Sequence, residues 1–151
     1  MNKIKGVAIW RFQIIISSMQ KLIGYMVTWT TYGTWPQGDE RGYVKDGEIL
    51  PANDKLKSAN QNQQKFQTVK LKSDQKQIVQ NAILQEAQKI NQKIFAIAVC
   101  SNHVHIVAEV SSESIEQIVH RYKRLSTFVL QKSGMATRKI WSTGFDKRFC
   151  F

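Results

Sequence analysis

Residues 96–110, with the sequence AIAVCSNHVHIVAEV, constrain the fold of this chain more than any other stretch. Two short apolar segments meet there at a polar corner, Ser101-Asn102, a pattern typical of two adjacent strands. Side chains alternate across a strand, so His103 and His105 share one face, with their Cβ atoms roughly 6–7 Å apart. From Val104 onward the alternate residues form an apolar face. The second strand therefore has one side for packing and another that is free for polar chemistry.

The spacing of His103 and His105 allows more than one interpretation. Two imidazoles this close can converge on one divalent cation, and they can equally be polar residues on the wet face of a half-covered sheet. A zinc site completed by Cys100 is a weaker alternative, because the chain has no Cys-x-x-Cys pair. Glu109 shares the histidine face, but it lies roughly 13 Å along the strand from His105, too far for a third ligand without a bend. The residues alone leave these alternatives open.

The charge of the chain favours a polyanionic partner. The 151 residues include 22 Lys and Arg against 11 Asp and Glu, a formal net charge of +11. The last 33 residues hold eight of the basic side chains and one acid, Asp146, which favours nucleic acid over an anionic membrane. The two cysteines, Cys100 and Cys150, are too few for a disulfide framework, and they indicate a reducing, cytoplasmic location.

Residues 1–23 are expected to form an N-terminal extension. Their apolar run, residues 7–16, is interrupted by Arg11 and Gln13 and is too short to span a bilayer, and no signal-peptide cleavage site follows it. Met19 is an alternative start of translation. We therefore expect no membrane association and a single folded domain over residues 24–151.

The rest of the chain follows the order strand, loop, helix, strand, strand, helix, strand. The expected segments are a strand at 24–31, a loop at 32–42, a polar excursion at 45–72, a helix at 74–91, strands at 94–100 and 103–110, a helix at 114–132 and a last strand from 140–141. This order predicts a ferredoxin-like α+β sandwich, βαββαβ, in which an antiparallel sheet carries two helices on one face. His103 and His105 would lie on the other, open face.

Three segments carry a resemblance to a known family. They are residues 24–42 (GYMVTWTTYGTWPQGDERG), residues 99–107 (VCSNHVHIV) and the basic helix at 115–131 with its Tyr-Lys-Arg sequence. The strand region 141–145 (WSTGF) extends the match. These segments resemble the single-tyrosine HUH transposases, specifically the branch of REP-associated tyrosine transposases, over about residues 24–151.

The resemblance implies a metal-dependent cut of single-stranded DNA in a DNA transposition reaction. His103 and His105 would be the metal ligands for Mg²⁺ or Mn²⁺, which would polarise the scissile phosphate. A tyrosine hydroxyl would attack, leaving a 5′-phosphotyrosine and a free 3′-OH. The implied partner is single-stranded or hairpin DNA. Members of the family occur as monomers and as dimers, so the resemblance also allows a homodimer.

Basic and aromatic side chains in the matching segments are expected to bind the DNA. The DNA-binding candidates are Arg121, Lys123, Arg124, Lys139, Lys147, Arg148, Trp35 and Arg41. The alternative for Trp35 is an anchor that packs its loop, instead of a surface on which a base stacks. Because Lys and Arg would neutralise the DNA backbone, the affinity is expected to fall steeply with salt.

The sequence departs from the family at the nucleophile. In the family the catalytic tyrosine lies on a helix after the last strand, and that helix would fall beyond Phe151. Tyr122 is the one tyrosine after the histidines and so the candidate within this chain, but it falls on the buried stripe of the preceding helix. We therefore expect a C-terminally truncated transposase that binds metal and DNA without strand transfer. Whether the chain is itself an enzyme stays open.

The alternative function is a non-catalytic nucleic-acid-binding protein of the same fold. RNA-recognition modules share the βαββαβ order and place exposed aromatic residues at the centre of the sheet. Here the central strand carries His-Val-His and no aromatic cluster, which argues against an RNA-recognition module. A structural zinc protein would need more ligands than the sequence offers.

Overall fold

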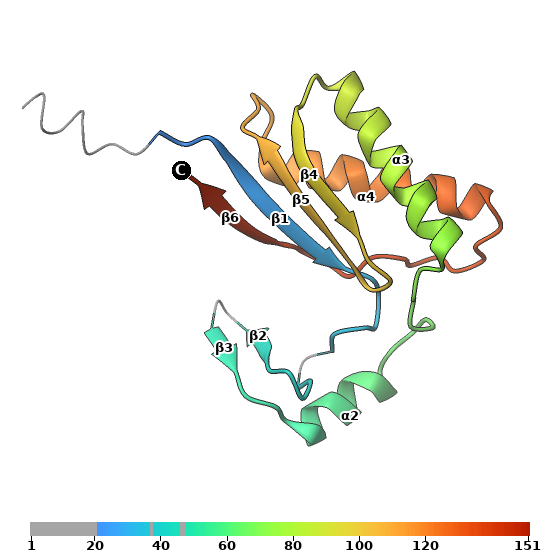
Figure 1. The fold of residues 1–151 in the computed structure, drawn as a ribbon. Coiled ribbons are helices and arrows are strands. Elements are labelled where there is room, and N and C mark those ends of the chain that lie inside the picture. Colours follow the sequence, from blue (N-terminus) through green and yellow to red (C-terminus); the bar gives the residue numbers. More distant parts are fainter. Residues whose placement is uncertain (1–20, 37, 46–47) are drawn as a thin grey trace, which may run out of the picture.

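The computed structural model describes residues 21–36, 38–45 and 48–151, and most of the expected N-terminal extension, residues 1–20, lies outside this part (Figure 1). The elements are β1 (Gly24–Thr30), β2 (Tyr43–Lys45), β3 (Glu48–Leu50), α2 (Asp54–Asn62), α3 (Ser73–Lys89), β4 (Ile94–Val99), β5 (His103–Glu109), α4 (Ile115–Lys132) and β6 (Asp146–Cys150).

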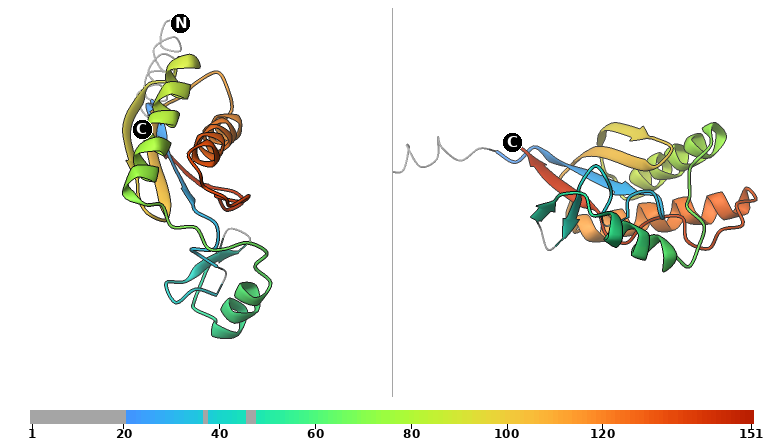
Figure 2. Two further views of the ribbon diagram at one scale, coloured as in Figure 1. Left: turned by 90° about the vertical axis from the view of Figure 1, so that its right-hand side faces the viewer. Right: turned by 90° about the horizontal axis from the view of Figure 1, so that it is seen from below.

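Four strands form one antiparallel sheet in the order β4-β5-β1-β6. Helices α3 and α4 pack against each other and cover one face of this sheet, while the other face is open (Figures 1 and 2). Helix α4 begins at a capping box between Ser114 and Gln117. The expected ferredoxin-like α+β sandwich is therefore confirmed.

Alternation along β1 and β5 decides what each face of the sheet presents. Tyr25, Val27 and Trp29 of β1 and Val104 and Ile106 of β5 are at most 1% exposed and form the core beneath the helices. The residues between them point to the open face. The alternation that the sequence shows in residues 103–110 therefore separates a packed side from an accessible side.

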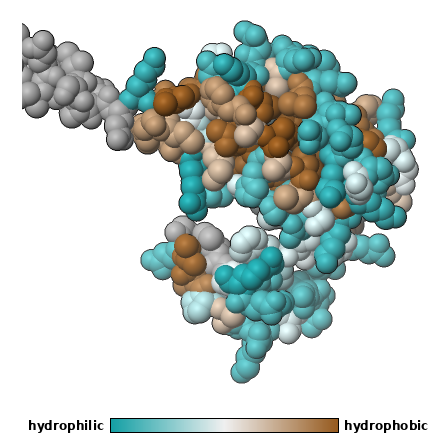
Figure 3. Space-filling view, in the orientation of Figure 1, coloured by the Kyte–Doolittle hydropathy of each residue, from teal (hydrophilic) through white to brown (hydrophobic). Residues whose placement is uncertain are grey.

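Away from the histidines the open face is mainly apolar. Its central region appears as a hydrophobic area in Figure 3, which views this face of the sheet. Ala96 and Ala98 of β4 are exposed, and Phe95 is 48% exposed beside Gly24. The two imidazoles of this face thus lie at the end of the sheet where β5 begins, and Arg148 and Asp146 add charged side chains along the β6 edge.

The last strand begins later than the sequence pattern predicts. Ile140 and Trp141 were expected to open it, but they pack into the core, and only an isolated bridge joins Trp141 to Thr31. The indole Nε1 of Trp141 donates to Ser126 of α4, which holds this segment beneath the sheet. The chain then turns at Gly144, with φ of 79°, before β6 starts at Asp146.

The polar excursion between β1 and α3 has more regular structure than expected. It contains the β2–β3 hairpin and α2, which form a separate lobe at one end of the sheet (Figure 1). None of the residues of α2 is buried, so the helix contributes little to a core. The excursion instead returns to the sheet through Val69 and Leu71, both buried. The Val69 carbonyl accepts the Thr31 hydroxyl, and the Leu71 amide donates to the Ser101 carbonyl.

Asp39 organises the loop that follows β1. Its buried carboxylate accepts from the Arg41 side chain at 2.6 Å and from the Arg41 backbone amide, and Lys57 of α2 lies 4.0 Å away. The hydrogen bond from Arg41 lowers the pKa of Asp39 from 3.8 to about 2. Arg41 also donates to the Thr34 carbonyl, which closes the loop around these two side chains.

Replacing Asp39 with Asn should destabilise the protein by about 1 kcal/mol at pH 7, because the partly exposed Arg41 loses its anionic partner. The folded-state pKa of Asp39 is depressed, so its contribution is complete above about pH 5 and is lost as the pH falls through 3.8 towards 2. Denaturant unfolding of both proteins should show the difference shrinking over that range. A difference that stayed constant from pH 7 to pH 2 would contradict the assignment.

No helix in the described residues is both long and apolar enough to cross a membrane.

Candidate functional site

The two histidines lie side by side where β5 begins. His103 is paired with Thr30 and His105 with Thr28 of β1, so all four side chains lie on the open face. The two imidazole centroids are 4.5 Å apart, and their planes are inclined by 72°. Both residues are half-buried. The corner before them is fixed because the Asn102 carbonyl accepts the Thr31 amide.

Hydrogen bonds set the orientation of both rings. Nδ1 of His103 donates to Oδ1 of Asn102 at 2.6 Å, since a carboxamide oxygen can only accept. Nδ1 of His105 lies 2.7 Å from Oγ1 of Thr28, which can accept the Nδ1 proton in the same way. In the tautomer with the proton on Nδ1, each ring keeps the lone pair of Nε2 for a ligand. Partners of this kind on the second ring nitrogen are typical of metal-binding histidines.

The local environment favours the neutral form of His103. Burial lowers its pKa below the ordinary 6.5, and the neighbouring His105 lowers it further. A metal ligand must be unprotonated, so this shift keeps the Nε2 lone pair of His103 available at neutral pH.

Replacing Thr28 with Val, which is nearly isosteric, should weaken Mn²⁺ binding about tenfold while leaving the fold intact. The hydroxyl that holds the His105 ring would be lost, but the β1–β5 pairing does not depend on it. Isothermal titration with Mn²⁺ measures the effect, and thermal unfolding monitors the fold. Unchanged Mn²⁺ affinity in the variant would contradict a role for Thr28 in orienting His105.

The donor set fits a partial metal site. Within the described ranges no group of three or more His, Cys, Asp or Glu side chains is arranged to hold a metal ion. Cys100 and Cys150 are free thiols. Two imidazole nitrogens with open positions suit a cation that takes its other ligands from a phosphate and water. The four protein ligands of a structural zinc site are not assembled by the described residues.

Tyr122 is not brought to the histidines. It is 1% exposed on the helix side of the sheet, and its hydroxyl donates to Oε1 of Gln92. Nε2 of Gln92 in turn donates to the Tyr25 hydroxyl at 2.6 Å. Burial raises the pKa of both phenols. The sheet therefore separates Tyr122 from the accessible site, and its hydroxyl is held in a protonated, bonded state.

Comparison with known proteins places this fold in a family. Residues 58–151, which include both histidines and helix α4, match the family described as transposase IS200-like. The chain belongs to the IS200-like transposase family. This confirms the resemblance expected from the histidine strand and the basic helix.

Two solved structures are similar to this member of the IS200-like transposase family. A REP-associated tyrosine transposase bound to a REP hairpin is 12% identical with a TM-score of 0.52, and the match covers 88% of this chain and 61% of that one. A candidate transposase from Deinococcus radiodurans R1 is 11% identical with a TM-score of 0.48, and the match covers 87% of this chain and 81% of that one. The first likeness supports the fold. No curated protein matches.

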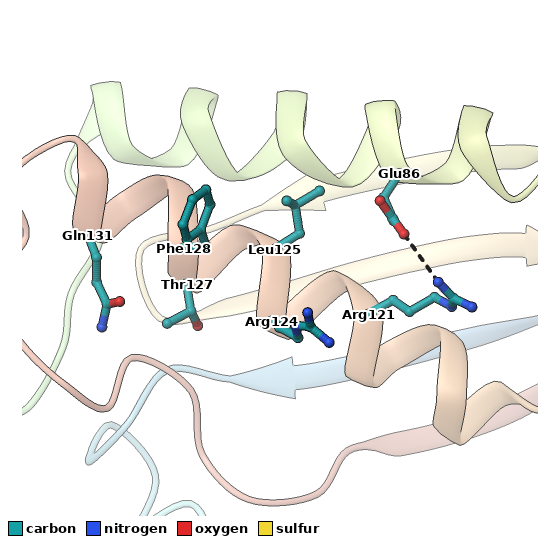
Figure 4. Close-up of a pocket in the computed structure, with 7 residues that line it drawn as sticks. All are labelled: Glu86, Arg121, Arg124, Leu125, Thr127, Phe128 and Gln131. Carbon is teal, nitrogen blue, oxygen red and sulfur yellow. Dashed lines mark ion pairs between the residues drawn. The ribbon is translucent and has the colours of Figure 1, made fainter.

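The predicted DNA-binding residues of this IS200-like chain are divided between two faces. Lys147 points to the helix side and pairs with Glu116 at 2.7 Å, whereas Arg148 points to the open face and lies 3.4 Å from Asp146. The helix side also carries Arg121 and Arg124 of α4 (Figure 4). The basic residues therefore do not form one patch around the histidines.

Lys123 and Lys139 are engaged within the protein. The ammonium of Lys123 donates to the carbonyls of Ser142 and Gly144, at 2.9 and 2.5 Å. Burial lowers its pKa to about 8. Lys139 lies over the ring of Tyr32, at 5.2 Å from its centroid. Lys123 thus holds the segment before β6, beside the end of β1, and its ammonium is less available to an external ligand than its position on a basic helix suggested.

Trp35 and Arg41 form a contact of their own in the loop after β1. The Arg41 guanidinium lies 4.6 Å from the centroid of the Trp35 ring, and the indole Nε1 donates to the Gly42 carbonyl. Trp35 is nevertheless 51% exposed. Both the packing role and a stacking role are compatible with this arrangement, because only one face of the ring is covered by Arg41.

The sequence patterns did not identify two residues that orient the histidine rings. Asn102 was recognised only as part of the corner, although its position directly before His103 was a usable signal. Thr28 lies 77 positions from His105, and its role depends on the β1–β5 register. Only knowledge of that register could have identified it.

Proposed function

We propose that this chain provides the metal-binding and DNA-binding part of an HUH-type, metal-dependent single-stranded DNA endonuclease that acts in DNA transposition. The observation that carries the proposal is the pair of histidines on the open face, each with Nδ1 engaged and Nε2 free. Membership of the IS200-like transposase family supports transposition as the setting.

The chain's own residues would divide the work at this site. Nε2 of His103 and Nε2 of His105 would hold Mg²⁺ or Mn²⁺, and the bound ion would polarise a scissile phosphate. Imidazole ligands suit Mn²⁺ better than the harder Mg²⁺. Thr28 and Asn102 keep both rings in the orientation that this requires.

The substrate proposed is single-stranded DNA next to a hairpin. The net charge of +11 favours a polyanion, and a protein of similar fold is described as bound to a REP hairpin. Hairpin DNA is therefore the first probe to use. A homodimer and a cytoplasmic location remain predictions, and sedimentation of the chain with and without DNA tests the first of them.

Neither Tyr25 nor Tyr122 is placed to supply the nucleophile. Tyr25 and Tyr122 are buried on the helix side, and the Tyr32 hydroxyl accepts the Lys65 amide in the excursion. We therefore propose that the 151-residue chain binds metal and DNA without forming a phosphotyrosine. The burial of Tyr25 and Tyr122 also favours the second candidate function, which is nucleic-acid binding without catalysis.

Incubation with labelled hairpin DNA and Mn²⁺ separates these functions. We expect binding that weakens at least tenfold between 50 and 200 mM salt, since backbone contacts dominate the affinity. We expect no covalent adduct on denaturing gels. An adduct that disappears in Tyr122→Phe would contradict the assignment of Tyr122 to the core, and salt-independent binding would contradict the electrostatic basis.

A further inference from the structure

A groove with a volume of about 580 Å³ lies between α3 and α4, on the side of the molecule away from the histidines. Leu125 and Phe128 of α4 line the groove and point towards α3, while Arg121 and Arg124 lie along the border of the groove (Figure 4). Glu86 of α3 closes one end by pairing with Arg121. The groove thus combines an apolar wall with a basic edge.

The charge at this edge is only partly compensated. Arg121 pairs with Glu113 at 2.9 Å and with Glu86 at 3.6 Å, so its charge is balanced. Arg124 is exposed and has no hydrogen bond or ion pair to any residue in the described part of the chain. The Lys132 ammonium lies over the Phe128 ring, 5.0 Å from its centroid, so Arg124 is the unpaired cation of the groove lining. The groove is therefore complementary to an anion.

Phe128 gives the groove a second kind of recognition. It is 53% exposed, in a helix whose other large apolar residues face the core or are half-buried. Lys132 lies over one face of the ring. An accessible aromatic ring beside a free arginine is an arrangement that stacks a base while a cation holds the backbone. The volume lies within the range of small-molecule sites, so it is large enough for one nucleotide.

We propose that this groove binds one unpaired nucleotide of the DNA, with its base stacked on Phe128 and its phosphate held by Arg124. The inference rests on the proposed function, because it assigns a second contact to the same DNA. It also implies that the strand passes around an edge of the sheet between the groove and the histidines. Several unpaired nucleotides must then separate the two contacts.

Two hairpins with the same stem test the proposal, one blunt and one with an adenine-rich single-stranded extension carrying 2-aminopurine. Binding to the full chain is measured by fluorescence anisotropy in EDTA, so that metal plays no part. Phe128→Ala and Arg124→Gln should each bind the extended hairpin about tenfold more weakly, in line with the loss of one stacked base. Their affinity for the blunt hairpin should change less than twofold. The 2-aminopurine emission should respond to wild type and not to Phe128→Ala.

Matched controls come from outside the groove. Leu84→Ala removes an exposed apolar side chain from α3. Leu84 is two positions before Glu86 and therefore lies on the side of α3 opposite to the groove. Lys70→Gln removes one positive charge from an exposed loop. Both controls should bind the extended hairpin as wild type does.

The outcomes distinguish the two proposals. Failure of wild type to bind either hairpin would overturn the proposed function. Binding by wild type that Phe128→Ala and Leu84→Ala weaken equally would overturn the nucleotide site alone. A change from dimer to monomer in Phe128→Ala would also overturn it, because the groove would then be occupied by a second copy of the chain.

Discussion

Replacing both His103 and His105 with Ala should weaken Mn²⁺ binding by at least about 100-fold. This loss is larger than the one expected for Thr28→Val, because Thr28 only orients a ligand. The reason is that the two neighbouring imidazoles are the pair of ligands proposed for the ion on the open face, and no group of three or more His, Cys, Asp or Glu side chains in the described part of the chain could replace them. Any Mn²⁺-dependent cleavage of hairpin DNA should also be absent in the double variant. Titration calorimetry measures the binding, and labelled DNA measures the cleavage.

His120 provides the control for this experiment. It is an exposed residue of α4, the helix that covers the opposite face of the sheet from His103 and His105. Its replacement with Ala should leave Mn²⁺ binding unchanged. DNA binding in EDTA should be similar in wild type and the double variant, because the basic side chains are untouched. Mn²⁺ binding that survives in the double variant would place the metal site elsewhere.

The histidine site shows what a strand pattern can and cannot predict. Alternation in residues 103–110 placed His103 and His105 on one accessible face, and the β1–β5 register confirms this placement. The pattern could not show that Thr28 lies beside His105, because that contact joins residues far apart in sequence. Nor could it show that Lys123 turns towards backbone carbonyls, since helix periodicity gives a direction and not a partner.

Replacing Gln92 with Leu should destabilise the protein by about 2–4 kcal/mol. Gln92 is 7% exposed and bonds the hydroxyls of Tyr25 and Tyr122, so its loss leaves two buried hydroxyls without their partner. A buried polar group without a partner costs about 1–3 kcal/mol. Denaturant unfolding, followed by circular dichroism, gives the change in the free energy of unfolding.

Tyr122→Phe is the matched variant for this network. It removes one hydroxyl and leaves Gln92 bonded to Tyr25, so its cost should be nearer 1 kcal/mol. A Gln92→Leu protein as stable as wild type would show that the hydrogen bonds contribute little. The network also explains why Tyr122, a candidate nucleophile by position in the sequence, belongs to the core.

The boundaries of the elements were predictable where local chemistry sets them. The capping box at Ser114 and the turn at Ser101-Asn102 are encoded within a few residues. The start of β6 was not, because Ile140 and Trp141 have the apolar character of a strand but find their partners in α4 and β1. Tertiary contacts thus decided a boundary that the local pattern misplaced.

The way the excursion leaves and rejoins the sheet has an evolutionary consequence. Tyr32 and Val69 are hydrogen-bonded to each other, and Leu71 bonds the corner that precedes His103. The segment between these clamps enters and exits at one point, so its length and sequence can diverge without moving the sheet. Changes in this segment can therefore alter the lobe that it forms while the sheet that carries His103 and His105 keeps its geometry.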